Sequence, residues 1–137
     1  MKKILLVDDY DADNFLHRMV IEKYGCAEII EICRNGSEAL DYIKAGLAAG
    51  ESLPDLIFLD INMPVMNGWE FLEAYEGLTD GRSGGTVVAM LTTSLNPDDR
   101  ARAEKSADVK YFAYKPLTAD KLTEILTKFY PESVRAD

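Results

Sequence analysis

The sequence predicts an α/β protein with a parallel sheet covered by helices on both faces, and two observations carry this prediction. Five short apolar runs of strand type alternate with helical patterns along the chain. The runs end on polar residues and read as strands that are buried on both faces, as in β-α-β units. A length of 137 residues fits one domain with one core.

In chain order, the strands are predicted at residues 3–8, 28–33, 55–60, 86–92 and 110–114. A helix is predicted after each strand. The first and fourth helices are predicted to have caps, Asp11 and Asn96, whose side chains can accept a hydrogen bond from the first helical turn. The second, third and fifth helices are predicted to open at 35–37, 67–68 and Thr118.

The first and fourth predicted helices differ in how they meet the core. The first should end at Gly25, and its inward stripe is predicted to comprise Phe15, Leu16, Met19, Val20 and Ile21. In the fourth, residues 99–105 contain no large apolar side chain, so that helix should be easier to shift. We also predict a flexible loop at 79–85 and a polar, frayed tail at 131–137.

Charge and composition exclude several classes of protein. A formal net charge of −9 disfavours nucleic acid as a direct partner, because phosphate contacts need clustered Lys and Arg. No apolar run approaches the roughly 20 residues of a membrane-spanning helix, so a cytoplasmic location without membrane insertion is expected. Cys26 and Cys33 lack metal-ligand spacing and should be reduced, largely buried thiols. The single histidine, His17, should have a packing or surface role.

Four predicted strands end on residues suited to phosphoryl and metal chemistry. Asp8 and Asp9 end the first strand, Asp60 the third and Thr92 the fourth, and Lys115 follows the fifth. The carboxyl ends of parallel strands share one edge of the sheet, where ligands bind in open α/β sheets. Three carboxylates crowded at that edge would repel one another. A divalent cation resolves the conflict, and oxygen-only ligands suit Mg²⁺.

Each residue of this set has a predicted role. Asp60 is the candidate nucleophile toward phosphorus because it stands alone at its strand end, whereas Asp8 and Asp9 are paired as metal ligands tend to be. Mg²⁺ and Lys115 would neutralise charge on the transferring group. Thr92 could donate its hydroxyl to a phosphoryl oxygen.

These motifs resemble the receiver domain of two-component response regulators, the CheY-like family. The matching segments are residues 6–9, 59–64, 67–68, 91–94 and 114–116. The resemblance covers nearly the whole chain, with a receiver domain at 1–130 and a short polar tail at 131–137. It implies a flavodoxin-like (βα)₅ fold with the strand order 2-1-3-4-5.

The resemblance also implies a ligand set. Asp60 would accept phosphate from a histidine kinase or a histidine phosphotransfer protein. Mg²⁺ would be bound by Asp9, Asp60 and the backbone carbonyl of Asn62, with Asp8 acting largely through water. Asn62 and Ser94 would tune the lifetime of the phosphorylated form.

The resemblance further implies a switch between two conformations. Thr92 would be coupled to an aromatic residue of the last strand, here Phe112, where the commoner tyrosine would carry a hydroxyl. Phosphoryl would draw Thr92 inward, open space for the ring and alter the face formed by the fourth helix, fifth strand and fifth helix. Thr93 replaces an alanine found in many relatives. The Lys115-Pro116 bond is expected to be cis.

The partners expected from the resemblance are proteins. A downstream protein would dock on that altered face, or phosphate would be relayed to a phosphotransfer protein. The length leaves no room for an output domain, so we expect a signalling module and not an enzyme. Its only chemistry would be self-phosphorylation from phosphodonors and auto-dephosphorylation, in a monomer or a weak, phosphorylation-dependent dimer.

Three alternatives differ in the site that they need. A phosphatase of the haloacid dehalogenase type would use Asp9 and Asp11, but Asp13 stands where that family has Thr or Val, and no cap domain is evident. A flavodoxin-like FMN carrier needs a Ser/Thr/Gly-rich loop, whereas the acidic segment at 8–11 would repel phosphate. A receiver that works without phosphorylation is not favoured, since every expected site residue is present.

Overall fold

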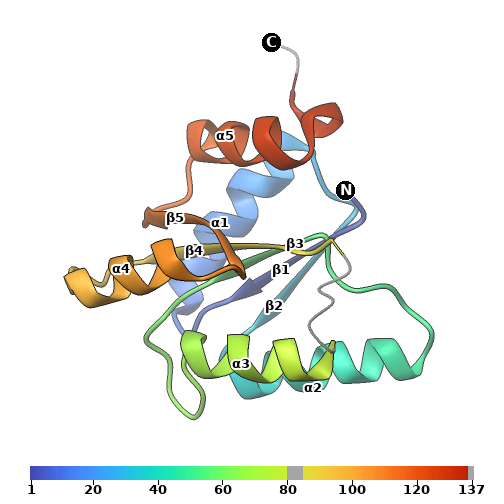
Figure 1. Cartoon of the computed structure of the whole chain (residues 1–137). Coiled ribbons are helices and arrows are strands. Elements are labelled where there is room, and N and C mark those ends of the chain that lie inside the picture. Colours follow the sequence, from blue (N-terminus) through green and yellow to red (C-terminus); the bar gives the residue numbers. More distant parts are fainter. Residues whose placement is uncertain (80–84, 136–137) are drawn as a thin grey trace.

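The structure is a computed structural model that describes residues 1–79 and 85–135. Five parallel strands form one sheet in the order β2-β1-β3-β4-β5, which confirms the predicted fold class and strand order (Figure 1). Every predicted strand boundary lies within one residue of the observed boundary. The strands are β1 (Lys3–Val7), β2 (Ile29–Cys33), β3 (Leu56–Leu59), β4 (Val87–Thr92) and β5 (Val109–Tyr114).

Helices cover both faces of the sheet, so two apolar clusters form, one on each side. Residues of α1 and α5 pack with one face, and residues of α2, α3 and α4 pack with the other (Figure 1). The helices are α1 (Asp11–Tyr24), α2 (Gly36–Ala48), α3 (Gly68–Leu78), α4 (Pro97–Lys105) and α5 (Ala119–Phe129). The predicted cap Asn96 is confirmed, and the predicted helix starts at Asn35, Asn67 and Thr118 are confirmed as well, each with a side chain that caps its helix.

The first helix departs from the prediction at its start. Asp11 is the first helical residue and not the cap, and Tyr10 before it makes no side-chain cap hydrogen bond. The predicted end is confirmed: Gly25 has φ 77° and donates its N–H to the carbonyl of Ile21.

The predicted inward stripe of α1 is wrong for three of its five residues. Phe15, Leu16 and Met19 have exposed fractions of 64%, 51% and 51%. Five residues crowded into 15–21 cannot all face one side of a helix with 3.6 residues per turn. The rotation of α1 is decided by polar contacts as well, because the buried amide of Asn14 donates to the carbonyl of Asp8 at 2.8 Å. The buried residues are Asn14, His17, Ile21 and Tyr24.

The weakly apolar α4 and the tail complete the fold. Ala103 is the buried residue of α4. The tail at 131–135 is not frayed, because Pro131–Ser133 form a 3₁₀ turn (η1) and the amide of Arg135 donates to the hydroxyl of Tyr24 at 3.1 Å. Residues 80–84 of the predicted loop and 136–137 of the tail lie outside the described residues. Within the part of the chain that the structure describes, no helix is long and apolar enough to span a membrane.

Candidate functional site

The parallel register brings the predicted site residues to one edge of the sheet. The amide of Asp60 donates to the carbonyl of Val7 at 3.0 Å, which fixes Asp60 beside Asp8. The amide of Lys115 donates to the carbonyl of Thr92, also at 3.0 Å. Both hydrogen bonds continue the ladder one step beyond the strands. The ends of β1, β3, β4 and β5 therefore meet as predicted.

Three carboxylates form one cluster at this edge. Asp8, Asp9 and Asp60 each contribute an oxygen, and these oxygens all lie within 4.8 Å of one another. Asp8 and Asp60 are 5% and 6% exposed, whereas Asp9 is exposed. Like charges at this separation are unfavourable in a desolvated site. The cluster is consistent with a metal site, and its oxygen-only ligands fit a hard divalent cation.

A single ammonium group lies against this cluster. Nζ of Lys115 is 2.7 Å from Oδ2 of Asp8 and 3.3 Å from Oδ2 of Asp60. It also lies 2.8 Å from Oδ2 of Asp13, a residue of α1 outside the predicted site. The Lys115 side chain is 7% exposed, so these contacts are poorly screened by water. The bond from Lys115 to Pro116 is cis, as expected.

Burial and charge shift the acid–base properties of the site. Burial, and next the charge of Asp8, raise the pKa of Asp60 to about 6, although Lys115 opposes the shift. Burial alone would lower the pKa of Lys115, but the carboxylates of Asp13, Asp8 and Asp60 hold it above its usual value. Asp60 therefore carries an unfavourable charge that a bound cation would stabilise.

The predicted switch residues lie on β4 and β5, the strands whose ends adjoin the cluster. Thr92 is fully buried, and its hydroxyl oxygen accepts the amide hydrogen of Ser94 at 3.0 Å. Phe112 is half-buried on β5, its ring centroid 5.7 Å from that of Tyr114 and 5.7 Å from the guanidinium carbon of Arg100. Phe112 therefore contacts α4 from β5, the strand that ends beside Lys115.

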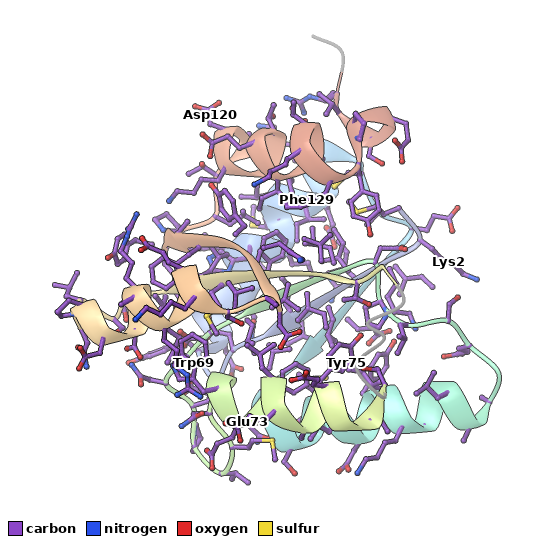
Figure 2. The ribbon with its side chains drawn as sticks, viewed as in Figure 1. Lys2, Trp69, Glu73, Tyr75, Asp120 and Phe129 are labelled. Atoms are coloured by element: carbon purple, nitrogen blue, oxygen red, sulfur yellow. The ribbon has the colours of Figure 1, made fainter. Side chains whose placement is uncertain are left out.

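One part of the site was not predicted from the sequence. The hydroxyl of Ser94 donates to Asp99 at 2.6 Å, and the indole of Trp69 donates to the same carboxylate at 3.1 Å. Trp69 lies between α3 and α4 (Figure 2), and the guanidinium carbon of Arg102 is 4.4 Å from its ring centroid. Asp99 also lies in the first turn of α4, where a carboxylate is favourable near the positive end of the helix dipole. Contacts between residues that lie far apart in the sequence, such as Trp69 and Asp99, leave no periodic pattern from which they could be predicted.

Apolar side chains surround the mouth of the site. Tyr10, Val65 and Leu95, in the loops after β1, β3 and β4, have exposed fractions of 65%, 83% and 83%. Phe15 and Met19 are exposed apolar residues of α1, the helix that begins directly after Tyr10. Exposed apolar groups gathered in one area indicate a surface for protein contact.

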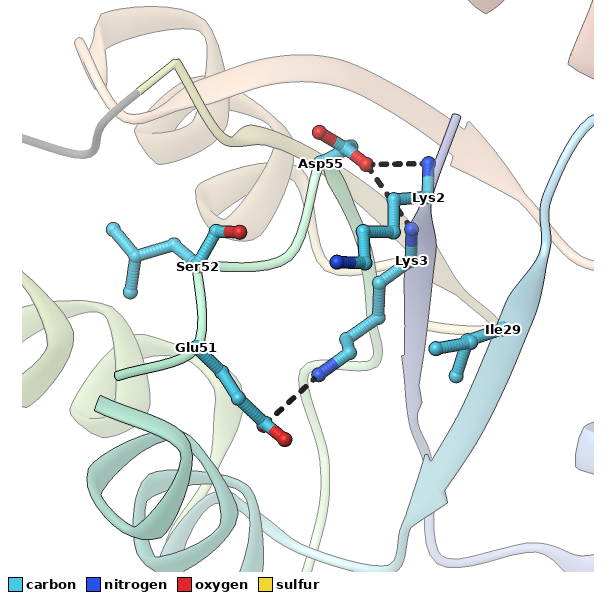
Figure 3. Close-up of a pocket in the computed structure, with 7 residues that line it drawn as sticks. Lys2, Lys3, Ile29, Glu51, Ser52 and Asp55 are labelled. Atoms are coloured by element: carbon cyan, nitrogen blue, oxygen red, sulfur yellow. Dashed lines mark hydrogen bonds and ion pairs between the residues drawn. The ribbon is translucent and has the colours of Figure 1, made fainter. Parts of the chain in front are cut away.

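A hollow of about 220 Å³ lies at the opposite edge of the sheet (Figure 3). Its charged groups are used within the fold: Nζ of Lys3 is 3.6 Å from Glu51, and Asp55 accepts the backbone N–H groups of Lys2 and Lys3. These contacts tie the start of β1 to neighbouring loops. The convergent titratable groups at the other edge make that edge the candidate site.

The remaining predicted residues take the following places. Asn62 is exposed in the loop after β3, and its backbone carbonyl as a ligand stays a prediction. Asp11, which the phosphatase alternative requires, is 3.1 Å from Arg34 and has a side chain 72% exposed, apart from the carboxylate cluster. Cys26 and Cys33 are free and buried, as predicted. His17 is buried, and its Nε2 has no hydrogen-bond partner among the described residues.

Comparison with known proteins agrees with this geometry. Residues 4–127 match the response regulator receiver domain. The probable methanogenesis regulatory protein FilR2 of Methanothrix harundinacea is 36% identical over 119 residues, which cover 87% of this chain and 75% of that protein. A solved two-component response regulator from Cytophaga hutchinsonii is 35% identical, with a TM-score of 0.87 over 96% of this chain and 98% of the other.

A phosphorylated member of the same group is also similar. The phosphorylated cyanobacterial phytochrome response regulator RcpA is 31% identical, with a TM-score of 0.72 over 93% of this chain and 89% of the other. Receiver domains are, in general, non-enzymatic signalling modules whose partners include histidine kinases. From its sequence match, its strand order and its acidic cluster, this chain belongs to the response regulator receiver domain family.

Proposed function

We propose that this chain is a phosphorylation-dependent switch in which Asp60 accepts a phosphoryl group from a phosphohistidine donor. The observation that carries the proposal is that Asp60 belongs to a cluster of three carboxylates and that the ammonium of Lys115 lies 3.3 Å from it. A carboxylate in that position can act as a nucleophile while a cation neutralises the incoming oxygens.

The transfer is a displacement at phosphorus. A carboxylate oxygen of Asp60 forms the new O–P bond while the N–P bond of the donor imidazole breaks, and the electron pair of that bond stays on the imidazole nitrogen. Lys115 donates to one phosphoryl oxygen and the Thr92 hydroxyl to another. Bound Mg²⁺, held by Asp8, Asp9, Asp60 and the carbonyl of Asn62, would supply further charge neutralisation.

The switch follows from the position of Thr92. A Thr92 hydroxyl engaged by phosphoryl changes its contact with the amide of Ser94, and the half-buried ring of Phe112 can enter the space that is vacated. The lack of large buried side chains in α4 lowers the resistance of that helix to movement. The α4-β5-α5 face would then bind a downstream protein, or the phosphate would pass to a phosphotransfer protein.

Exposed apolar residues support the proposal that the phosphoryl donor is a protein. The ring of Tyr10 lies 5.9 Å from the Lys115 ammonium, and Phe15 and Met19 are exposed on the helix that follows it, so we infer that a protein that brings a phosphohistidine to Asp60 would bury them. We expect Met19→Glu to slow transfer from a phosphorylated histidine phosphotransfer protein at least about tenfold. The rate with acetyl phosphate should not change, because that donor needs no docking surface.

Acetyl phosphate with Mg²⁺ tests the proposal directly. The intact mass should rise by one phosphoryl group in the wild-type chain. It should rise equally in the control variant Asp11→Asn, because Asp11 lies near the cluster in sequence but outside it in the structure. The substitution Asp60→Asn should abolish the rise. Modification that persists in Asp60→Asn would show that another residue is the nucleophile.

A further inference from the structure

The ammonium of Lys115 contacts one carboxylate more than the phosphoryl chemistry requires. An ammonium group has three N–H donors, and the three nearest carboxylates are those of Asp8, Asp13 and Asp60, at 2.7, 2.8 and 3.3 Å. The contact with Asp13 is thus as short as that with Asp8. It joins the first turn of α1 to the end of β5 across 102 residues of sequence.

Asp13 differs from the other two partners because it contacts Lys115 but does not belong to the carboxylate cluster. The group of carboxylates suited to a cation comprises Asp8, Asp9 and Asp60, and Asp13 is not a member. A divalent cation on Asp8 and Asp60 would repel an ammonium a few Å away. Lys115 must then give up contacts with these two oxygens, whereas its contact with Asp13 costs the cation nothing.

We propose that Asp13 is a positioning residue that holds Lys115 in the site while Mg²⁺ takes Asp8 and Asp60. This inference rests on the proposed function and adds a residue to it. With Asp13 in place, Lys115 has an alternative partner, so the cation displaces it from Asp8 and Asp60 at lower cost. Lys115 also stays within reach of the phosphoryl oxygens, instead of moving out into water on its flexible stem.

The surroundings of Asp13 suit this role. Its side chain is 31% exposed, and its Oδ2 lies 2.8 Å from Nζ of the buried Lys115 side chain. The ring of Tyr10 lies 5.9 Å from the same ammonium and limits its freedom further. The neighbouring Asn14 bonds the carbonyl of Asp8, which fixes the turn that carries Asp13 relative to the cluster.

Titration calorimetry with Mg²⁺ tests the role of Asp13 without phosphorylation. We expect Asp13→Asn to raise the Mg²⁺ dissociation constant about fivefold, since Lys115 then pairs only with the metal ligands. Asp11→Asn is the matched control, because it removes the same charge from the same helical turn at a residue paired with Arg34. It should change the constant by less than about twofold.

A second pair of variants asks whether Asp13 acts through Lys115. In the Lys115→Ala background, Asp13→Asn should change Mg²⁺ affinity by less than about twofold. In metal-free protein, the effects of Asp13→Asn and Lys115→Ala on thermal unfolding should be non-additive, a readout that needs no Mg²⁺ and also shows that each variant folds.

Three results would overturn the inference. These are equal effects of Asp11→Asn and Asp13→Asn, an undiminished Asp13→Asn effect without Lys115, and no detectable Mg²⁺ binding by the wild-type chain. A failure of the proposed function is separate, because it appears as an unchanged intact mass with acetyl phosphate in a protein that binds Mg²⁺.

Discussion

The indole nitrogen of Trp69 in α3 donates a hydrogen bond of 3.1 Å to Asp99 in α4. The other oxygen of Asp99 accepts the hydroxyl of Ser94 at 2.6 Å, and the amide of Ser94 donates to the hydroxyl of Thr92. Three hydrogen bonds therefore connect the indole ring to Thr92, a residue of the proposed phosphoryl site. Arg102 extends the contact between the helices, since it also lies 3.4 Å from Glu73 of α3, a residue that Figure 2 places one turn after Trp69.

This chain of hydrogen bonds predicts an optical signal of phosphorylation. Trp69 is the single tryptophan of the sequence, so its fluorescence reports one location. Acetyl phosphate with Mg²⁺ should change the emission, because a Thr92 hydroxyl engaged by phosphoryl alters the Ser94–Asp99 contact. Asp60→Asn should show no change. An emission spectrum that stays constant while the intact mass shows full phosphorylation would contradict the predicted coupling.

Two substitutions in α1 test the observed rotation of this helix. Phe15→Ser should change the free energy of unfolding by no more than about 0.5 kcal/mol, because the ring is 64% exposed. Ile21→Ala should cost about 2–4 kcal/mol, because its side chain is fully buried. Urea unfolding followed by circular dichroism measures both. A loss for Phe15→Ser as large as that for Ile21→Ala would show that the Phe15 ring is buried, as the sequence pattern predicts.

Two glycines of α3 are expected to respond in opposite directions to alanine. A Cβ atom at Gly68 would lie 2.4 Å from the backbone carbonyl oxygen of Asp60, so Gly68→Ala should destabilise the fold by about 1–3 kcal/mol. It should also slow phosphorylation, because the added methyl group would push the backbone at Asp60 and Ile61 out of its place. A Cβ atom at Gly77 would meet no atom of another described part of the chain within 4 Å, and Gly77→Ala should stabilise the helix by about 0.5–1 kcal/mol. Equal effects at both positions would argue against the close packing of Gly68.

The buried thiol of Cys33 predicts a pH dependence. Burial raises the pKa of Cys33 to about 12 from 9.0, so the folded chain keeps this proton between those pH values while the unfolded chain loses it. The corresponding stability is present below pH 9 and is lost as the pH rises toward 12. In a Cys26→Ala background, disulfide-reagent labelling at pH 8 should be at least about 100-fold slower in the folded than in the urea-unfolded chain. Similar rates in both states would show that the thiol is accessible.

The fold and the core of the site follow from local features of the sequence. Apolar runs bounded by polar residues locate the strands, and Asn or Thr at the right offset locates four helix starts. The site residues stand at strand ends, and parallel strands present these ends at one edge. Asp8, Asp60, Thr92 and Lys115 could therefore be assigned to one site before any coordinates were considered.

Asp11 and the apolar residues of α1 mark where local reasoning failed. A capping pattern does not distinguish the residue before a helix from the first residue within it, and Asp11 is the latter. Apolar residues at helical spacing usually face the core. In α1, however, the polar Asn14 and His17 are buried, and Phe15 and Met19 are exposed. An exposed apolar surface of a helix has the same sequence pattern as one that faces the core.

The sequence alone determined which elements form, in which order, and which side chains end the strands, because these depend on short-range periodicity and on the direction of parallel strands. The tertiary structure alone decided the rotation of α1, the approach of Asp13 to Lys115 and the hydrogen bonds that join Ser94, Asp99 and Trp69. These contacts join residues of different helices and strands, and their partners are selected by how the helices pack, which no local pattern encodes.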